Sequence, residues 1–400
     1  MTNELMKQST SQLTAPQIGY CTNVHAGTDL ATIRQRLDEV AVPVAQTLGA
    51  NERLGIGLWL PNSAALELNS LDKIKSLRDW FAERSFNAFT INGFPYDNFH
   101  LPVVKHRVYL PTWADDTRLA YTIRLAKILA GLHRDSDNSL ATISTLPIGW
   151  PSANDDEAIK QSGARLRKLA MILGEIETET GVRVVIGIEP EPGCVIDRWQ
   201  DMTQFFETEL PQPLHRKYIG VCHDVCHSAV MFEDQTKVLF GYAGAGIMVA
   251  KVQVSSAIDL PLATMQSDER DEAVAQLRSF AEDRYLHQTG CIDATGTFRL
   301  VEDLPQWLSS DGVNQDAHVR VHFHVPIFLK SFGQLRSTQG AIGQCVQTLL
   351  QTDAPEFTGH WEVETYAWTV MPPEMRASGL AADIARELEW FKTALGVRTA

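Results

Sequence analysis

VRVVIGIEPEP, residues 182–192, is a short apolar run that ends on two glutamates, Glu189 and Glu191. Its length, its valines and isoleucines, and the prolines that close it are typical of a buried β-strand. A carboxylate at the end of such a strand is costly to bury unless it is paired or binds a metal ion. The stretch therefore predicts a strand that leads into a polar centre.

Three further apolar runs end in the same way, on acids or on histidines. The residues concerned are His223, Asp224 and His227 after residues 218–222, His322 and His324 after residues 319–321, and Glu362 and Glu364 after residues 360–361. We expect these strand ends to converge on one site.

The rest of the chain alternates short apolar runs with longer amphipathic stretches. Strands are expected at residues 18–24, 54–60, 87–93, 140–146, 182–188, 218–222, 247–255 and 361–368, and helices at 31–48, 63–84, 117–133, 157–180 and 380–395, with a break at Pro43. Such alternation indicates an α/β protein with a parallel sheet. Eight strands favour a (β/α)8 TIM barrel over a doubly wound sheet, and no Gly-x-Gly-x-x-Gly motif follows the first strand.

The domain organisation follows from this pattern. We expect a disordered tail at residues 1–17 and a single barrel domain at 18–400. About a hundred residues separate the seventh and eighth expected strands, more than one helical connection needs. Residues 257–330 are therefore predicted to be an insertion near the barrel mouth.

Composition excludes several function classes. The chain has 400 residues, is 44% hydrophobic and carries a net charge of −14, which argues against nucleic-acid binding. Neither a membrane span nor an N-terminal signal segment is visible. Six scattered cysteines indicate a reduced, cytoplasmic protein, and a small-molecule substrate is the expected partner.

A bound cation would offset the repulsion between several acids at the barrel mouth. Glu189, Asp224 and Glu364 come from three different strand ends, and their charges would repel one another. Carboxylates suit Mg²⁺ or Mn²⁺, and an added imidazole widens the choice to Zn²⁺, Co²⁺ or Fe²⁺. The alternative is that arginines such as Arg183 or Arg320 neutralise these acids.

Other polar residues near the expected strand ends are candidates for binding substrate. They are His25, Asn92, Tyr96, Glu191, His227 and His322. His25 could equally be a buried structural histidine, and Glu191 could turn away from Glu189 after Pro190. Lys251 is expected to form a structural ion pair.

At this point the sequence resembles the xylose isomerase-like barrels. The resemblance rests on Asp224-Val225-Cys226-His227 after a strand, with Glu189 and Glu364 ending two others. That superfamily includes sugar isomerases, ketose 3-epimerases, inosose dehydratases and endonuclease IV. The resemblance implies that Glu189 and Glu364 are metal ligands and the catalytic acid–base pair, that Asp224 is a ligand, and that His227 contacts metal or substrate.

One departure from that pattern concerns the seventh strand. Where the epimerases of the superfamily have a histidine, this chain has Gln253, whose carbonyl oxygen is a weaker ligand. His322 or His324 in the insertion could supply the missing ligand, because two residues spaced by one on a strand share a face. The predicted metal ligands are therefore Glu189, Asp224, Gln253, His324 and Glu364.

A second resemblance covers residues from about 18 to the C-terminus. The sequence resembles the EboE-type metabolite traffic proteins in the segments Tyr20–His25, Thr90–Tyr96, Ser144–Trp150, Val321–Pro326 and Glu362–Tyr366. This implies a role in secondary metabolism with partner proteins of the same pathway. The oligomeric state stays open, a homo-oligomer included.

Three functions are compatible with the sequence. The first is a metal-dependent isomerase or epimerase that acts on a sugar-like or polyol intermediate by glutamate-mediated proton transfer. The second is a non-catalytic protein that binds a metabolite and passes it on within its pathway. The third, metal-dependent phosphodiester hydrolysis, is disfavoured by the net charge of −14.

Overall fold

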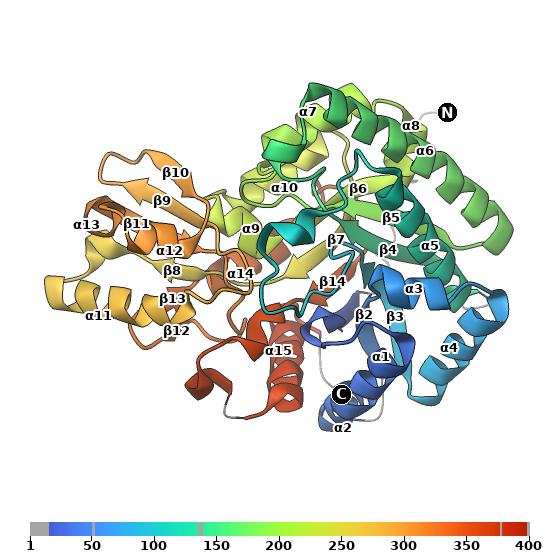
Figure 1. Ribbon diagram of the computed structural model, residues 1–400, viewed down its shortest axis with the longest axis horizontal. Helices are drawn as coiled ribbons and strands as arrows, with labels where there is room; N and C mark the ends of the chain where they lie inside the picture. The colour runs from blue at the N-terminus through green and yellow to red at the C-terminus, as the bar shows by residue number, and fades with distance from the viewer. Residues whose placement is uncertain (1–15, 50–52, 135–138, 377, 398–400) are drawn as a thin grey trace, which may run out of the picture.

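A computed structural model describes residues 16–49, 53–134, 139–376 and 378–397. Eight parallel strands close into a barrel, with the order β1-β14-β7-β6-β5-β4-β3-β2 (Figure 1). These strands are β1 Gln17–Cys21, β2 Leu54–Trp59, β3 Phe86–Asn92, β4 Leu140–Thr145, β5 Arg183–Ile188, β6 Ile219–Asp224, β7 Val249–Val254 and β14 His360–Val363. The predicted TIM barrel is thereby confirmed. Most of the expected disordered tail lies outside the described residues.

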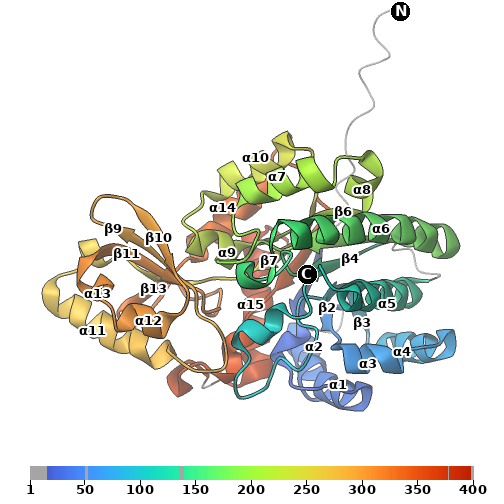
Figure 2. The same cartoon turned by 45° about the horizontal axis from the view of Figure 1, so that its top comes forward.

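Helices surround the barrel on its outer side (Figures 1 and 2). They are α1 Leu30–Arg36, α2 Val42–Leu48, α3 Asn62–Glu67, α4 Leu71–Glu83, α5 Asp116–His133, α6 Asp156–Thr180, α7 Trp199–Glu209, α8 Pro213–Tyr218, α9 Val225–Val230, α10 Gln235–Gly244, α14 Gln339–Leu349 and α15 Leu380–Ala394. The longest, α6, begins where the Asp155 side chain accepts a hydrogen bond from Ala158 N, and it ends at Gly181, whose φ is +73°. Gly181 then turns the chain directly into β5. None of the helices in the described ranges is long and apolar enough to cross a membrane.

Two expected element boundaries were wrong. Pro43 does not break its helix, because the π-helical turn Leu37–Ala41 precedes it and places the proline in the first turn of α2, where its missing N–H costs little. The last strand ends at Val363 rather than near residue 368, and a 3-10 turn at Tyr366–Thr369 follows. Glu364 lies just past the strand, with its backbone N–H bound to the Val254 carbonyl oxygen.

The insertion forms a second, antiparallel sheet directly after β7. Its strand order is β10-β9-β11-β8-β13-β12. The strands are β8 Ile258–Leu260, β9 Thr289–Asp293, β10 Phe298–Val301, β11 Asp316–Val321, β12 Ser331–Phe332 and β13 Leu335–Ser337, with helices α11 Ser267–Leu277, α12 Leu304–Leu308 and α13 Gly312–Gln315. The sheet extends past residue 330, because β13 pairs with β8. Figures 1 and 2 show this part of the chain beside the barrel.

The interior of the barrel contains a buried ion pair beneath the strand ends. Lys251 on β7 donates a hydrogen bond to Glu362 Oε2 on β14, and both side chains are fully buried. Gly57 on β2 leaves the space that Glu362 occupies, since a Cβ at Gly57 would lie 1.5 Å from Glu362 Oε1. The structural ion pair expected for Lys251 is therefore present, and its positive charge lies below the mouth of the barrel.

Candidate metal centre

Three buried carboxylates meet at the carboxyl ends of the barrel strands. Glu189 follows β5, Asp224 ends β6 and Glu364 follows β14, and one oxygen from each lies within 4.8 Å of the others. Burial, followed by the charges of neighbouring acids, raises the pKa of Glu189 and of Glu364 well above the ordinary value. Among the described residues, no arginine or lysine forms an ion pair with any of the three. The expected alternative partner Arg320 binds Asp259 instead, with Nε 2.7 Å from Oδ1.

Asp224 is oriented by the helix that begins beside it. It is the N-cap of α9, and its Oδ1 accepts hydrogen bonds from His227 N at 2.9 Å and from Ser255 Oγ at 2.8 Å. Although burial acts to raise the pKa of Asp224, His227, His324 and these hydrogen bonds outweigh it and hold the pKa below its ordinary value. Its Oδ2 accepts no hydrogen bond from the described residues.

His324 reaches the carboxylates from the segment that follows β11. Its Nδ1 lies 2.7 Å from the backbone oxygen of Glu364. Because a carbonyl oxygen can only accept, Nδ1 carries the hydrogen, and Nε2 keeps its lone pair. Burial lowers the pKa of His324 to about 4, so the ring is neutral at neutral pH. Metal-bound histidines usually donate their other ring nitrogen to an oxygen in this way.

Several buried polar atoms at this point have no hydrogen-bond partner in the described part of the chain. They are Glu189 Oε2, Asp224 Oδ2, Gln253 Oε1 and Nε2, and His324 Nε2. Nearly all buried polar atoms in proteins are paired, so such a concentration requires an explanation. Carboxylate, amide and imidazole donors together fit a divalent cation. These atoms belong to four of the five residues predicted as metal ligands.

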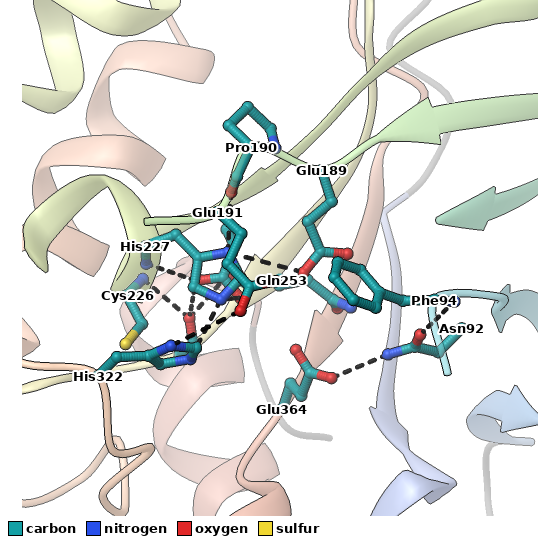
Figure 3. A network of polar contacts seen from close by, with 12 residues as sticks. Asn92, Phe94, Glu189, Pro190, Glu191, Cys226, His227, Gln253, His322 and Glu364 are labelled. Atoms are coloured by element: carbon teal, nitrogen blue, oxygen red, sulfur yellow. Dashed lines mark hydrogen bonds and ion pairs between the residues drawn. The ribbon is translucent and has the colours of Figure 1, made fainter. Parts of the chain in front are cut away.

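The fifth predicted ligand, Glu364, is held by two asparagines. Glu364 Oε1 accepts from Asn23 Nδ2 at 2.7 Å. It also accepts from Asn92 Nδ2 at 2.8 Å (Figure 3). Asn92 was predicted to bind substrate; its amide nitrogen donates to the Glu364 carboxylate, and the residue also lines the adjoining pocket. Asn23 was not selected from the sequence, although it lies just after the first strand, much as Asn92 ends the third.

A second polar group adjoins the carboxylates. His227 and His322 face one another with 3.2 Å between their Nε2 atoms, and a nitrogen of each lies within 4.8 Å of a Glu191 oxygen (Figure 3). Glu191 Oε1 accepts from Tyr109 OH at 2.7 Å and from Gln288 Nε2 at 3.0 Å. Tyr109 and Gln288 were both missed at the sequence level, because neither lies at the end of a barrel strand.

The two groups open on one small pocket with a cavity volume of about 60 Å³. Its lining includes Glu189, Glu191, His227, His322, His324 and Glu364. Aromatic side chains close the other sides: Phe99 lies 4.8 Å from Tyr285 between ring centroids, and Tyr285 lies 4.9 Å from Tyr366. The insertion thus supplies the imidazoles of His322 and His324 and part of the apolar wall.

Two residues predicted to bind substrate lie outside this pocket. His25 is buried against Tyr20, with 5.7 Å between ring centroids, and Tyr96 packs on Tyr121 at 5.0 Å. The other predicted substrate contacts line the pocket: Asn92, Glu191, His227 and His322.

The expectation that His322 and His324 share a strand face was wrong, since β11 ends at Val321. Both rings nevertheless line the pocket, with 5.2 Å between their centroids.

Comparisons with known proteins identify solved structures of similar fold but no sequence relative. No protein-family model and no curated protein matches the chain. A probable 3-DHS dehydratase, AsbF, from Bacillus anthracis has 13% sequence identity and a TM-score of 0.46, covering 94% of this chain and 98% of its own. The IOLI protein with a bound zinc atom has 12% identity, a TM-score of 0.47 and coverage of 95% and 98%.

A D-tagatose 3-epimerase-like protein has 12% identity and a TM-score of 0.47, covering 95% of this chain and 97% of its own. Similarity at this level carries no argument about activity, and the strand pairing alone demonstrates the barrel. The resemblance to EboE-type proteins is not confirmed by these comparisons.

Proposed function

We propose that this protein is a divalent-metal-dependent isomerase or epimerase that removes a proton from a carbon of a small sugar-like or polyol substrate and returns a proton to the same or the adjacent carbon. The observation that carries the proposal is the pair Glu189 and Glu364, which approach one pocket from two strands and have raised pKa values. A carboxylate with a raised pKa is a stronger base toward a carbon-bound proton when it is ionised, and a usable acid when it is protonated.

The chain's own residues have distinct roles in this proposal. Glu189 removes the proton from the carbon beside a carbonyl group, which leaves an enediolate. Glu364 returns a proton to the other face of the same carbon in an epimerisation. In an isomerisation the proton goes to the former carbonyl carbon, and the hydroxyl proton passes to the former carbonyl oxygen. Asn23 and Asn92 hold Glu364 in place through its Oε1. A divalent cation held by Glu189, Asp224, Gln253, His324 and Glu364 would polarise the substrate oxygens and stabilise negative charge beside them.

The pocket supports a small substrate. A cavity of about 60 Å³, with aromatic side chains beside its acids and imidazoles, has no room for a nucleic-acid strand. Lys105, the one lysine or arginine among the described residues of its lining, is paired with Asp303 at 2.5 Å. Phosphodiester hydrolysis is therefore the less supported function.

Proton exchange with solvent tests the proposal on a range of candidate substrates at once. The Mn²⁺-loaded protein is incubated in D₂O with a panel of small ketoses and aldoses, and deuterium at the carbon beside the carbonyl is followed by NMR. We expect incorporation with at least one compound. We expect Glu189→Gln and Glu364→Gln to lower its rate by about 10²–10⁴-fold, the usual contribution of a general base or acid.

The control is Glu157→Gln, an exposed position on α6 that should leave the rate unchanged. Exchange that persists at full rate in both active-site variants would overturn the acid–base assignment. Tight binding of a panel compound without any exchange would favour the non-catalytic metabolite-binding function, in line with the resemblance to traffic proteins.

A further inference from the structure

The facing imidazoles of His227 and His322 present an electrostatic problem. Their rings lie 4.6 Å apart between centroids at an angle of 79°, and the two Nε2 atoms are 3.2 Å apart. Both side chains are buried. Which nitrogen of each ring carries the hydrogen decides whether this contact is attractive.

The hydrogen on His227 is fixed by a backbone carbonyl. Its Nδ1 lies 2.9 Å from the Pro190 oxygen, which can only accept, so Nδ1 is the protonated nitrogen. Pro190 follows Glu189 in the chain. The turn that positions the Glu189 carboxylate therefore also orients the His227 imidazole. In the neutral ring, His227 Nε2 has a lone pair and no hydrogen.

The hydrogen on His322 is fixed by a glutamine. His322 Nδ1 lies 2.7 Å from Gln288 Oε1. The Gln288 amide has only one consistent orientation, because its Nε2 donates to Tyr109 OH at 2.9 Å and to Glu191 Oε1 at 3.0 Å. Oε1 must therefore accept from His322, and His322 Nε2 likewise has a lone pair in the neutral ring.

Two lone pairs at this distance repel one another unless a positive group lies between them. Two nitrogens bound to one tetrahedral zinc ion at about 2.0–2.1 Å are separated by about 3.3 Å, close to the 3.2 Å found here. Both rings also donate Nδ1–H to an oxygen acceptor, as metal-bound histidines almost always do. The geometry is that of a pair of metal ligands.

Glu191 supplies a carboxylate to the same place. Its oxygen lies within 4.8 Å of a nitrogen from each ring. Tyr109 and Gln288 both donate to Oε1, whereas Oε2 accepts no hydrogen bond from the described residues. The Glu191 carboxylate is thus held in place through Oε1, and Oε2 is available to bind a ligand.

We propose that His227, His322 and Glu191 form a second divalent-cation site beside the carboxylate centre. Two imidazoles and one carboxylate are the donor set of several catalytic zinc sites, and they favour Zn²⁺ over Mg²⁺. His227 Nε2 lies 3.9 Å from Asp224 Oδ2, so the two centres adjoin. The site uses neither Glu189 nor Glu364, and it therefore stands independently of the proposed acid–base pair.

Metal stoichiometry distinguishes the two centres. The full-length protein is saturated with Zn²⁺ and freed of excess ion, and its zinc content is measured by inductively coupled plasma mass spectrometry. We expect two zinc ions per chain in the wild type, one in His322→Gln and one in Glu364→Ala. His318→Gln, on β11 and paired with Asp259, is the matched control and should retain two.

One ion in the wild type that is retained in His322→Gln would overturn the second site and leave the carboxylate centre intact. Loss of all zinc in Glu364→Ala, together with two ions in His322→Gln, would also overturn it.

Anomalous diffraction from wild-type crystals soaked in Zn²⁺ avoids any dependence on how the variants fold. We expect a zinc peak about 2.0–2.1 Å from both Nε2 atoms. A proton shared between the rings would give no such peak. Absence of the peak at saturating zinc, even with an ion at the carboxylates, would overturn the proposal.

Discussion

His324 Nδ1 lies 2.7 Å from the backbone oxygen of Glu364, and this hydrogen bond joins the insertion to the last strand of the barrel. The bond sets the tautomer of His324, and it ties the imidazole to the residue whose side chain enters the same pocket. The inserted ring is thus held by the backbone of the residue that carries the carboxylate, rather than by a bond between two side chains.

Replacing His324 with glutamine should weaken cation binding at the carboxylate centre. The variant loses a neutral nitrogen donor whose lone pair is already directed by the Glu364 carbonyl. We expect the affinity for Mn²⁺, measured by isothermal titration calorimetry, to fall by at least about tenfold. His106→Gln, whose half-exposed side chain is not among the residues that line the pocket, serves as the control. Unchanged affinity in His324→Gln would remove this residue from the ligand set.

Removing either asparagine from Glu364 should extend catalysis to higher pH. Asn23 and Asn92 donate to the carboxylate, and the bond from Asn23 lowers the Glu364 pKa. Asn23→Ala should therefore raise that pKa further. Because Glu364 acts as the acid, the limb on which the exchange rate falls with rising pH should move to higher pH. A lost hydrogen bond of about 1.4 kcal/mol corresponds to a shift of about one pH unit. An unshifted profile would mean that Glu364 does not act as the base or acid.

The fully buried Glu387 on α15 should make stability depend on pH. Burial raises the pKa of Glu387 from 4.5 to about 7, although Thr365, Ile327 and Trp368 all donate to it. Since the folded-state pKa is the higher one, this contribution to stability is complete below pH 4.5 and is lost as the pH rises through about 7. The shift corresponds to about 3 kcal/mol.

Urea unfolding of the wild type and of Glu387→Gln at several pH values measures this contribution. The difference between the two proteins should change across that interval, because glutamine does not titrate. A difference that is constant from pH 4 to pH 8 would show that Glu387 does not titrate in this range.

Gly57→Ala should destabilise the protein strongly. The added methyl group would lie 1.5 Å from Glu362 Oε1, and Glu362 cannot withdraw without leaving Lys251 unpaired in the barrel interior. We expect a loss of about 3 kcal/mol or more in the free energy of unfolding. Gly343→Ala, in the middle of α14 with no atom within 4 Å of the new Cβ, should instead stabilise by about 0.5–1 kcal/mol. Equal effects of the two substitutions would contradict the steric explanation.

The barrel could be predicted because each strand is a separate apolar run, and because parallel strands direct their carboxyl ends to one mouth. The same reasoning predicts from the sequence that Glu189, Asp224 and Glu364 lie close together, and the structure has them so. Which of His322 and His324 enters the carboxylate centre could not be settled in that way. Both lie beyond β11 in irregular chain, and their directions depend on bonds to Gln288 and Glu364.

The contributions of Tyr109 and Gln288 could not be predicted for a similar reason. Each is distant in sequence from the residues it orients, and each acts through a side-chain hydrogen bond that no local pattern encodes. Asn23 was within reach, since it follows β1 as Asn92 ends β3.

The carboxylates of the centre come from the barrel and its imidazole comes from the insertion, so neither part alone holds the full donor set. A cation bound there would link the barrel to the insertion, in addition to the hydrophobic core that the two already share. By mass action, its free concentration would then set how firmly the insertion is seated and how often the pocket is exposed to solvent. Supply of the ion would thus govern the integrity of the active architecture as well as its chemistry.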